Sequence, residues 1–316
     1  MKLEWLGADD VEVAVRKALK IPRRKAVEVK NANFAKIKNQ KFFVTFDSKT
    51  VLVTFFARPS VAKKESLILD YLGSPKKLYF KNELLIREKV EGAVLSPWGC
   101  SDETLGQMAR IILAFRDRPV SDELKKHHLS FSQMKREALA VLPAARETFI
   151  PFRGSKEAFA AFAKILSGDW QKKLRRLPKG FVHGDFQPQN ILLGNGKISL
   201  IDFDRGGYFY SLFDVASFAV QFTHAALLES HHKREKLDRR EIRRRVQLFV
   251  KEYRENTGEF DEETFRLFKL LIIFNGLAFS TAGFRKKVAR GYKHLLFGLF
   301  RQELKWFAGR EVNSRS

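Results

Sequence analysis

The feature that most constrains this chain is a pair of short motifs on either side of a predicted hairpin. The first, at residues 181–193, reads FVHGDFQPQNILL, and the second, at residues 200–206, reads LIDFDRG. The apolar residues that end the first motif and lead into the second flank a Gly- and Asn-rich turn, which predicts two paired, buried strands. Asp185 and Asn190 before the hairpin and Asp202 after it are therefore expected to lie close together.

These three side chains have the chemistry of a magnesium site beside a catalytic carboxylate. Carboxylate and amide oxygens are hard ligands, suited to Mg²⁺ bridging phosphates rather than to zinc. In kinase-type phosphoryl transfer, a catalytic Asp is followed five positions later by a metal-binding Asn, and an Asp after the next hairpin holds Mg²⁺. Asp185, Asn190 and Asp202 meet these conditions in order. A His-Gly-Asp turn alone would be an ordinary turn, so the prediction depends on all three occurring together.

Over residues 181–217 the sequence resembles the aminoglycoside phosphotransferase and choline kinase family. That family has a catalytic loop His-Gly-Asp-x-x-x-x-Asn and a metal motif Ile-Asp-Phe-Asp or Ile-Asp-Phe-Glu. The resemblance implies ATP as phosphoryl donor, Asp185 as the group that accepts the proton of the acceptor hydroxyl, and Mg²⁺ as cofactor. It further implies that Asn190 and Asp202 hold the Mg²⁺.

The same resemblance assigns two supporting residues. His183 would brace the catalytic loop rather than titrate in the reaction. Asp214 begins the segment Asp-Val-Ala, which resembles the family's helix start that braces this loop by hydrogen bonds. We expect Asp214 to be structural, with its loss still damaging activity.

The first 90 residues predict a small antiparallel sheet with helices, the arrangement expected of a kinase-like N-terminal lobe. The strands are rich in Phe and Val, and a hairpin turn is predicted at 47–50. The predicted elements are a helix at 9–20, strands at 26–29, 34–37, 42–46 and 51–56, and a helix at 63–72.

Glu65 lies on the second of these helices, where the family carries a Glu that pairs with a strand Lys or Arg. That pair would hold the α- and β-phosphates of ATP. The sequence departs from the pattern, because Val53 and Thr54 stand where the basic residue is expected. Glu65 as an ordinary exposed helix acid stays an open alternative. Either Arg58, Lys49 or Lys36 replaces the missing cation, or nucleotide binding is weakened.

Residues 84–92, LLIREKVEG, resemble the family's strand and hinge, where backbone groups read the adenine edge. Glu88 and Val90 are assigned to ATP binding on this ground, and Gly92 permits the chain to cross. The order of elements predicts an α+β, two-lobed protein-kinase-like fold. We expect a small antiparallel-sheet N-terminal lobe at 1–90, a larger, mainly helical C-terminal lobe at 91–309 and a disordered tail at 310–316.

Helical patterns fill the C-terminal part of the chain. Prolines at 119, 143 and 151 predict only short helical pieces between 117 and 153. The basic run at 231–245 could contact nucleic acid or anionic lipid, but its interspersed acids favour a solvated helix face with ion pairs. The last helix is amphipathic and basic, and packing on the lobe is favoured over a membrane interface. The predicted helices are 101–115, 155–176, one from about 213 to 228, 261–281 and 284–307.

The charge balance bears on the acceptor. The chain carries 59 Lys and Arg against 36 Asp and Glu, a formal net charge of +23 at pH 7. Such a surface attracts anions and disfavours a polycationic acceptor such as an aminoglycoside. Asp204 and Arg205 are the acceptor-side candidates, with Arg205 binding an anion. Kinases of the lipopolysaccharide inner-core sugar are similar at Ile-Asp-Phe-Asp-Arg-Gly. A source with generally basic proteins is the alternative explanation of the charge.

Composition also suggests a compartment. The chain has one cysteine, Cys100, which excludes an internal disulfide, and its apolar runs are too short to span a bilayer. No secretory signal is visible at the N-terminus. A cytoplasmic location is expected, and a peripheral position at the inner face of an anionic membrane stays open.

Together these features predict an ATP- and Mg²⁺-dependent phosphotransferase with an alcohol group as acceptor. The acceptor is expected to be a small-molecule or lipid-linked, anionic compound such as a sugar. Two other classes stay open: a catalytically silent kinase fold that binds nucleotide or an anionic partner, and a basic protein that binds nucleic acid or a membrane surface. The acceptor's identity, the choice between ATP and GTP, and the oligomeric state also stay open.

Overall fold

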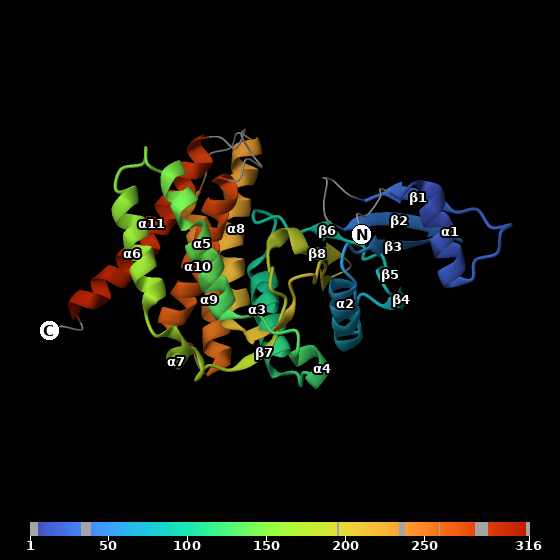
Figure 1. Ribbon diagram of the computed structural model, residues 1–316, viewed down its shortest axis with the longest axis horizontal. Helices are drawn as coiled ribbons and strands as arrows, with labels where there is room; N and C mark the ends of the chain where they lie inside the picture. Colours follow the sequence, from blue (N-terminus) through green and yellow to red (C-terminus); the bar gives the residue numbers. More distant parts are fainter. Residues whose placement is uncertain are drawn as a thin grey trace. The chain divides into compact units, whose positions relative to one another are not determined.

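The computed structural model describes residues 6–32, 39–194, 196–233, 238–258, 260–281 and 290–313. The chain divides into two compact units, and Figure 1 labels most of their helices and strands. The sheet unit comprises Met1–Leu95, Val120–His127 and Gln189–Gly207, and the helical unit comprises Ser96–Pro119, His128–Pro188 and Tyr208–Ser316. The boundary between the two lobes, expected between residues 90 and 91, stays a prediction, because the division into compact units does not define the lobes.

The sheet unit is built on a five-stranded antiparallel sheet with strand order β1-β2-β3-β5-β4 (Figure 1). Asp47 and Ser48 join β2 to β3, and both have positive φ, 47° and 60°. Two such residues form the short hairpin turn that matches the twist of the flanking strands. The strands are β1 (Glu28–Asn31), β2 (Gln40–Phe46), β3 (Lys49–Phe55), β4 (Lys77–Lys81) and β5 (Leu84–Glu88).

The two faces of this sheet have different surroundings. Strand alternation gathers apolar side chains against helix α1 (Ala8–Leu19) on one face. The side chains of Thr54 and Arg87 point to the other face, where helix α2 (Pro59–Leu72) packs on β4 and β5. The apolar cluster consists of Val11, Val15, Ile21, Phe42, Val44, Val51, Val53 and Ile86. Position 53 thus belongs to the core, and position 54 to the α2 side.

A second sheet in the same unit has strand order β6-β8-β9. Strands β8 (Ile191–Gly194) and β9 (Lys197–Leu200) form the hairpin predicted from the sequence, and β6 (Ala93–Val94) pairs with β8. Gly92 precedes β6 with a φ of 148°, and a Cβ atom there would lie 2.9 Å from the carbonyl oxygen of Leu193. Only glycine therefore lets this segment approach β8 so closely.

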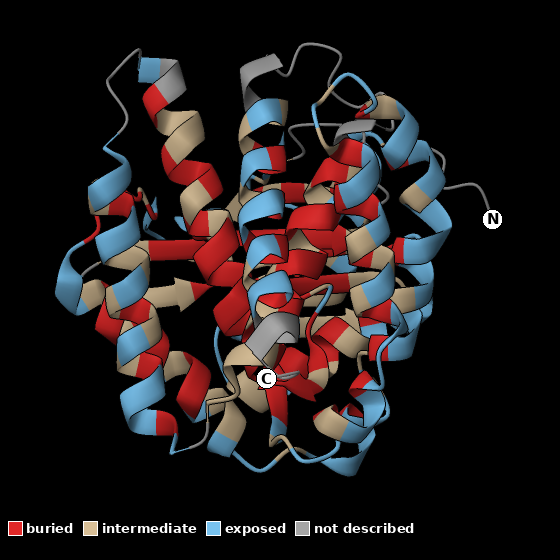
Figure 2. Cartoon of the chain, turned by 90° about the vertical axis from the view of Figure 1, so that its left-hand side faces the viewer, coloured by how far each residue is buried: buried red, intermediate tan, exposed pale blue. Residues whose placement is uncertain are grey.

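The helical unit packs its helices around α8 and α10. Helix α10 contacts α8, α11 and α5, while α3 contacts α9 and strand β7. Figure 2 shows buried residues along one side of these helices and exposed residues along the other. The elements are α3 (Asp102–Asp117), α5 (Phe131–Thr148), α6 (Ser155–Ser167), α7 (Trp170–Leu174), β7 (Lys179–Val182), β10 (Gly207–Tyr210), α8 (Leu212–Lys233), α9 (Arg239–Thr257), α10 (Glu262–Thr281) and α11 (Arg290–Asn313).

Phenylalanine rings fill much of this core. Phe162 stacks on Phe274 with ring centroids 4.4 Å apart, and Phe149 stacks on Phe297 at 5.8 Å. All four rings are buried. The Phe-rich pattern of the C-terminal helices is therefore explained by packing. An α+β fold with a small antiparallel-sheet N-terminal part and a helical C-terminal part is confirmed.

Several predicted elements are corrected by the structure. Strand β4 was not among the predicted strands. Pro143 lies inside the 18-residue helix α5 instead of ending it. An interior proline removes a backbone hydrogen bond, but α5 is held by its packing on α6 and α10. The single helix predicted at 155–176 is two helices, because Gly168 ends α6 and Asp169 caps α7.

The C-terminal prediction also changes. Helix α11 continues to Asn313, so residues 310–313, predicted as part of a disordered tail, are helical. The predicted start of this helix at 284, the strand at 34–37 and Lys36 all lie outside the described residues.

Candidate active site

Asn190 and Asp202 lie at the open end of the β8–β9 hairpin. Ile191 pairs with Leu200, and the N–H of Ile201 donates to the carbonyl oxygen of Asn190 over 3.0 Å. This backbone bond brings Asn190 next to the residue that precedes Asp202. The hairpin therefore brings Asn190 and Asp202 to neighbouring backbone positions, and the expected convergence of both with Asp185 stays a prediction.

The Asp202 carboxylate is paired with a lysine that the sequence analysis did not single out. Lys41 Nζ, from β2, lies 3.1 Å from Asp202 Oδ1, with side chains 23% and 37% exposed. Asp202 itself has a φ of 67°, a left-handed conformation that is uncommon outside glycine. Such backbone strain clusters at functional sites, and here it falls on the predicted metal ligand.

Glu65 on α2 is buried and faces Arg87 on β5. The Arg87 Nε and Glu65 Oε1 atoms are 3.9 Å apart, and both side chains are 4% exposed. Burial raises the pKa of Glu65, and the charges of Arg87 and Lys41 oppose that rise. At this distance the contact is an ion pair without a hydrogen bond. Glu65 is therefore not an ordinary exposed helix acid, and its partner comes from β5 rather than β3.

Asp204 and Arg205, the predicted acceptor-side residues, differ in exposure. Burial raises the pKa of Asp204, and the nearby charge of Asp202 raises it further. Lys64 donates to the backbone carbonyl of Asp204. Arg205 is exposed. Arg205 is thus the more accessible of the two to an anion in solution.

In the helical unit, Asp214 holds the backbone of the loop that carries Asp185. Its Oδ2 accepts from the N–H of His183 over 2.6 Å, and its Oδ1 accepts from the N–H of Gly184 over 3.0 Å. Complete burial raises the pKa of Asp214 to about 7, while these two bonds act in the opposite direction. Gly184 has a φ of 76°, which favours glycine at the turn.

Asp185 is the partly accessible residue of this loop. Its neighbours His183, Gly184 and Phe186 are buried, whereas Asp185 is half-buried. The side-chain amide of Gln187 donates to Asp185 Oδ2 over 2.9 Å. An ionised carboxylate is an acceptor through both of its oxygens and can take up a proton.

The family model for the phosphotransferase enzyme family matches residues 83–249, more than half of the chain. The match includes the loop around Asp185, the β8–β9 hairpin and Asp214. The chain belongs to this family. The resemblance drawn from the two motifs is thereby confirmed, as is the enzyme class, a phosphotransferase. A search of the curated proteins found no match.

Solved structures of several kinases share the fold. A choline kinase from Cryptosporidium parvum Iowa II is 16% identical, with a TM-score of 0.65 over 97% of this chain and 98% of that one. The choline kinase LicA from Streptococcus pneumoniae is 14% identical, with a TM-score of 0.61 over 93% and 99%. A protein described as a fructosamine-3-kinase from Thermobifida fusca is 15% identical, with a TM-score of 0.57 over 95% and 100%. At these identities the likeness shows the fold.

The segment that the sequence predicts to be the hinge follows β5. The N–H of Glu88 donates to the carbonyl oxygen of Lys76 over 2.9 Å, so this donor is committed within the sheet unit. Val90 lies outside the strand ladder and is partly exposed. Adenine contacts at Glu88 and Val90 stay predictions, and for Glu88 they are restricted to its carbonyl group.

The donor chemistry near Asp202 fits a magnesium ion that arrives with phosphate. Asn190 and Asp202 would offer it an amide and a carboxylate oxygen. Within the described ranges, no three His, Cys, Asp or Glu side chains gather closely enough to hold a metal by themselves. Mg²⁺ often takes only one or two protein carboxylates and completes its shell with water and substrate phosphates. This small donor set is therefore the kind expected for a nucleotide-bound metal.

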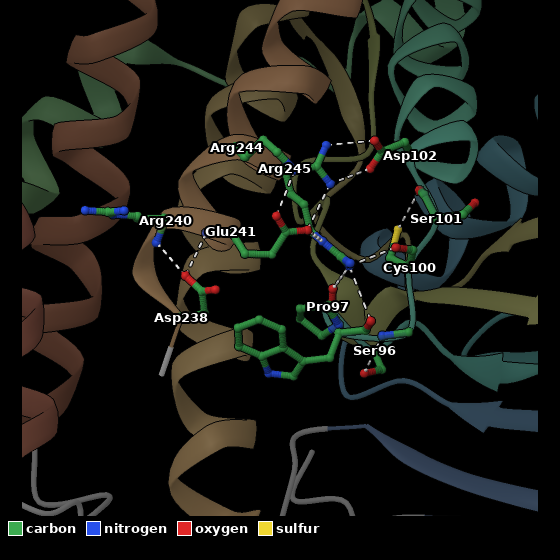
Figure 3. A network of polar contacts seen from close by, with 12 residues as sticks. Ser96, Pro97, Cys100, Ser101, Asp102, Asp238, Arg240, Glu241, Arg244 and Arg245 are labelled. Atoms are coloured by element: carbon green, nitrogen blue, oxygen red, sulfur yellow. Dashed lines mark hydrogen bonds and ion pairs between the residues drawn. The ribbon is translucent and has the colours of Figure 1, made fainter. Parts of the chain in front are cut away.

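The basic helix α9 is engaged in contacts within the helical unit (Figure 3). Arg245 Nη1 donates to the carbonyl oxygens of Pro97 over 2.5 Å and Cys100 over 2.8 Å. Arg244 makes a bidentate pair with Asp102 and also binds Glu241. These arginines hold the segment before α3 to α9, which agrees with the expected ion-paired helix face. They lend no support to nucleic-acid binding by this run.

None of the helices in the described parts of the chain has the length and apolar character needed to cross a bilayer.

Proposed function

We propose that this phosphotransferase moves the γ-phosphate of ATP to a hydroxyl group of a small-molecule or lipid-linked acceptor, with Mg²⁺ as cofactor. Two observations carry the proposal: Asp214 fixes the backbone of the loop that bears Asp185, and the β8–β9 hairpin bonds Asn190 to Ile201, the residue before Asp202. Structures with the same fold include a streptomycin–ATP–APH(2'')-IIa ternary complex and LicA with AMP, which supports a nucleotide donor.

Each residue has a distinct part in this proposal. Asp185 accepts the proton of the acceptor hydroxyl or orients its oxygen for in-line attack. Asn190 and Asp202 hold Mg²⁺, which supplies positive charge next to the transferred phosphoryl group. His183 and Asp214 keep the loop backbone fixed, so that the Asp185 carboxylate needs little reorganisation.

The acceptor is proposed to be anionic, such as a phosphorylated or acidic sugar. The net charge of +23 favours the approach of anions. Arg205, exposed and one residue after Asp204, is the residue proposed to bind the anionic group. A polycationic acceptor would be repelled by the same surface.

The test is turnover with Mg-ATP against a panel of hydroxyl-bearing acceptors, beginning with anionic and lipid-linked sugars. Asp185→Ala and Asp202→Ala are each expected to lower the rate of transfer at least about a hundredfold. Asp9→Ala, which removes an exposed carboxylate from α1, is the matched control and should keep the wild-type rate. Circular dichroism would verify that all variants are folded.

Wild-type rates in Asp185→Ala would contradict the proposal. A catalytically silent kinase fold makes a different prediction, because it would bind Mg-ATP without transfer to any acceptor in the panel. Turnover therefore separates the two hypotheses, whereas nucleotide binding alone does not.

A further inference from the structure

The position that should carry a strand cation is occupied by Thr54, and its cross-strand partner is a lysine. In the β2–β3 register, Lys41 lies directly opposite Thr54. Side chains that oppose each other in an antiparallel pair point to the same face of the sheet, with Cβ atoms about 5 Å apart. Lys41 and Thr54 therefore share the α2 face, whereas Val53 points into the α1 core.

The Lys41 ammonium group also lies near the acidic residues that such a cation would accompany. It is 3.1 Å from Asp202 Oδ1, and its charge, after that of Arg87, opposes the rise that burial causes in the pKa of Glu65. In kinase-type enzymes the strand cation pairs with the helix Glu, while the Asp after the hairpin holds the metal. Lys41 thus pairs with Asp202 and acts electrostatically on Glu65, from β2 instead of β3.

The other nearby cations are committed or inaccessible. Arg87 is only 4% exposed and faces Glu65. Lys64 donates to the carbonyl group of Asp204, and burial lowers its pKa. Since Arg87 compensates the charge of Glu65, the partly exposed Lys41 is not needed for that purpose.

The replacements considered from the sequence fit less well. Lys49 is exposed at the turn end of β3, five residues from Thr54, which is about 17 Å along a strand. Arg58 is exposed and occupies the N-cap of α2. Lys36 lies outside the described residues.

We propose that Lys41 is the phosphate-binding cation of this enzyme and binds the α- and β-phosphates of ATP from strand β2. This inference rests on the proposed function, since it assumes that ATP is the donor. Lysine binds phosphate as a point charge on a long, flexible side chain. A lysine on β2 can therefore place its ammonium group where a cation from the adjacent strand β3 would otherwise lie.

The first test compares the binding of Mg-ATP and of adenosine by isothermal titration calorimetry. Lys41→Met should weaken Mg-ATP binding about tenfold or more, because a charge-assisted contact to phosphate is lost. Adenosine has no phosphates, and its affinity should stay unchanged. Lys49→Met removes the same charge from the same hairpin and should leave both affinities at the wild-type value.

The outcomes separate this inference from the proposed function. A wild-type protein that binds neither ligand would contradict the proposed function itself. Wild-type binding of Mg-ATP that is unchanged in Lys41→Met would overturn only the role of Lys41. Equal losses in Lys41→Met and Lys49→Met would overturn it too, since they would indicate a general effect of net charge.

A second measurement on the wild-type protein avoids any effect of substitution on folding. An acyl-phosphate derivative of ATP transfers its acyl group to a nearby lysine amine, and mass spectrometry locates the modified residue. Lys41 should be the main labelled lysine, and excess ATP should suppress the label. Suppressible labelling at another lysine, without labelling of Lys41, would overturn the inference.

Discussion

The two units hold a buried carboxylate in different ways. In the helical unit, Asp214 accepts hydrogen bonds from the backbone N–H groups of His183 and Gly184. In the sheet unit, Glu65 faces the guanidinium group of Arg87 at 3.9 Å, without a hydrogen bond. One carboxylate is satisfied by main-chain dipoles and the other by a side-chain charge.

The difference decides what each contact depends on. Backbone donors are present whatever the residue, so the Asp214 contacts require only that the loop pass next to the start of α8. The Glu65 contact requires a cation at one position of β5. Burial raises the pKa of both carboxylates, to about 7 for Asp214. Breaking the Glu65–Arg87 pair should therefore lower stability more than breaking the Asp214 contacts, because it leaves one charged side chain buried without its partner.

The largest expected effect on stability comes from Glu65→Leu. This substitution leaves Arg87 buried without its partner, and breaking a buried ion pair in this way typically costs about 3–5 kcal/mol. The double variant Glu65→Leu with Arg87→Met removes both charges and should recover most of that loss. Urea unfolding of the two single variants and the double variant measures the coupling. Additive losses in the double variant would show that the pair is not coupled.

The Asp214 contact is best tested by pH. With its pKa near 7, this carboxyl keeps its proton in the folded state up to about pH 7, whereas the unfolded chain loses the proton near the ordinary pKa of 3.8. The unfolded state therefore binds fewer protons in this range, and the contribution of Asp214 to stability falls as pH rises. Between pH 5 and pH 7 the fall is about 2 kcal/mol.

Asp214→Asn should lack this component, because an amide does not titrate. The measured quantity is the free energy of unfolding in urea at pH 5 and pH 7, taken as the difference between wild type and variant. Asp9→Asn, which makes the same substitution at an exposed residue of α1, serves as the control. The raised pKa of Asp214 would be contradicted if the difference in free energy of unfolding between wild type and Asp214→Asn did not change with pH. It would also be contradicted if the wild type became relatively more stable as pH rises.

The same contrast explains what the sequence could and could not predict. The loop and hairpin were predictable because their residues are close in sequence and their spacing is fixed by local geometry. Arg87 was not found as the partner of Glu65, because the two residues are brought together by the packing of α2 on the sheet. Pro143 misled the prediction for a related reason, since tertiary packing keeps α5 continuous around it.

The sequence analysis did not single out Lys41, because it predicted the wrong length for the turn between β2 and β3. The predicted turn at 47–50 would pair Phe43 with Thr54, whereas the observed turn at Asp47 and Ser48 pairs Lys41 with Thr54. Asp-Ser lacks the Asn-Gly or Asp-Gly signature that marks such a two-residue turn. An error of two residues in turn length thus moved the register by two positions and concealed the lysine.

The smallest effect is expected where a carboxylate pairs with arginine at the surface. Asp102 binds Arg244 with two hydrogen bonds, of 2.7 and 2.9 Å, which is better geometry than Glu65 has with Arg87. Both side chains are about half exposed, however, and water solvates them when the pair is broken. Arg244→Gln should therefore leave the urea midpoint within the scatter of replicate measurements, with any change reduced further by added salt. If Arg244→Gln were as destabilising as Glu65→Leu, burial would not be what distinguishes the two pairs.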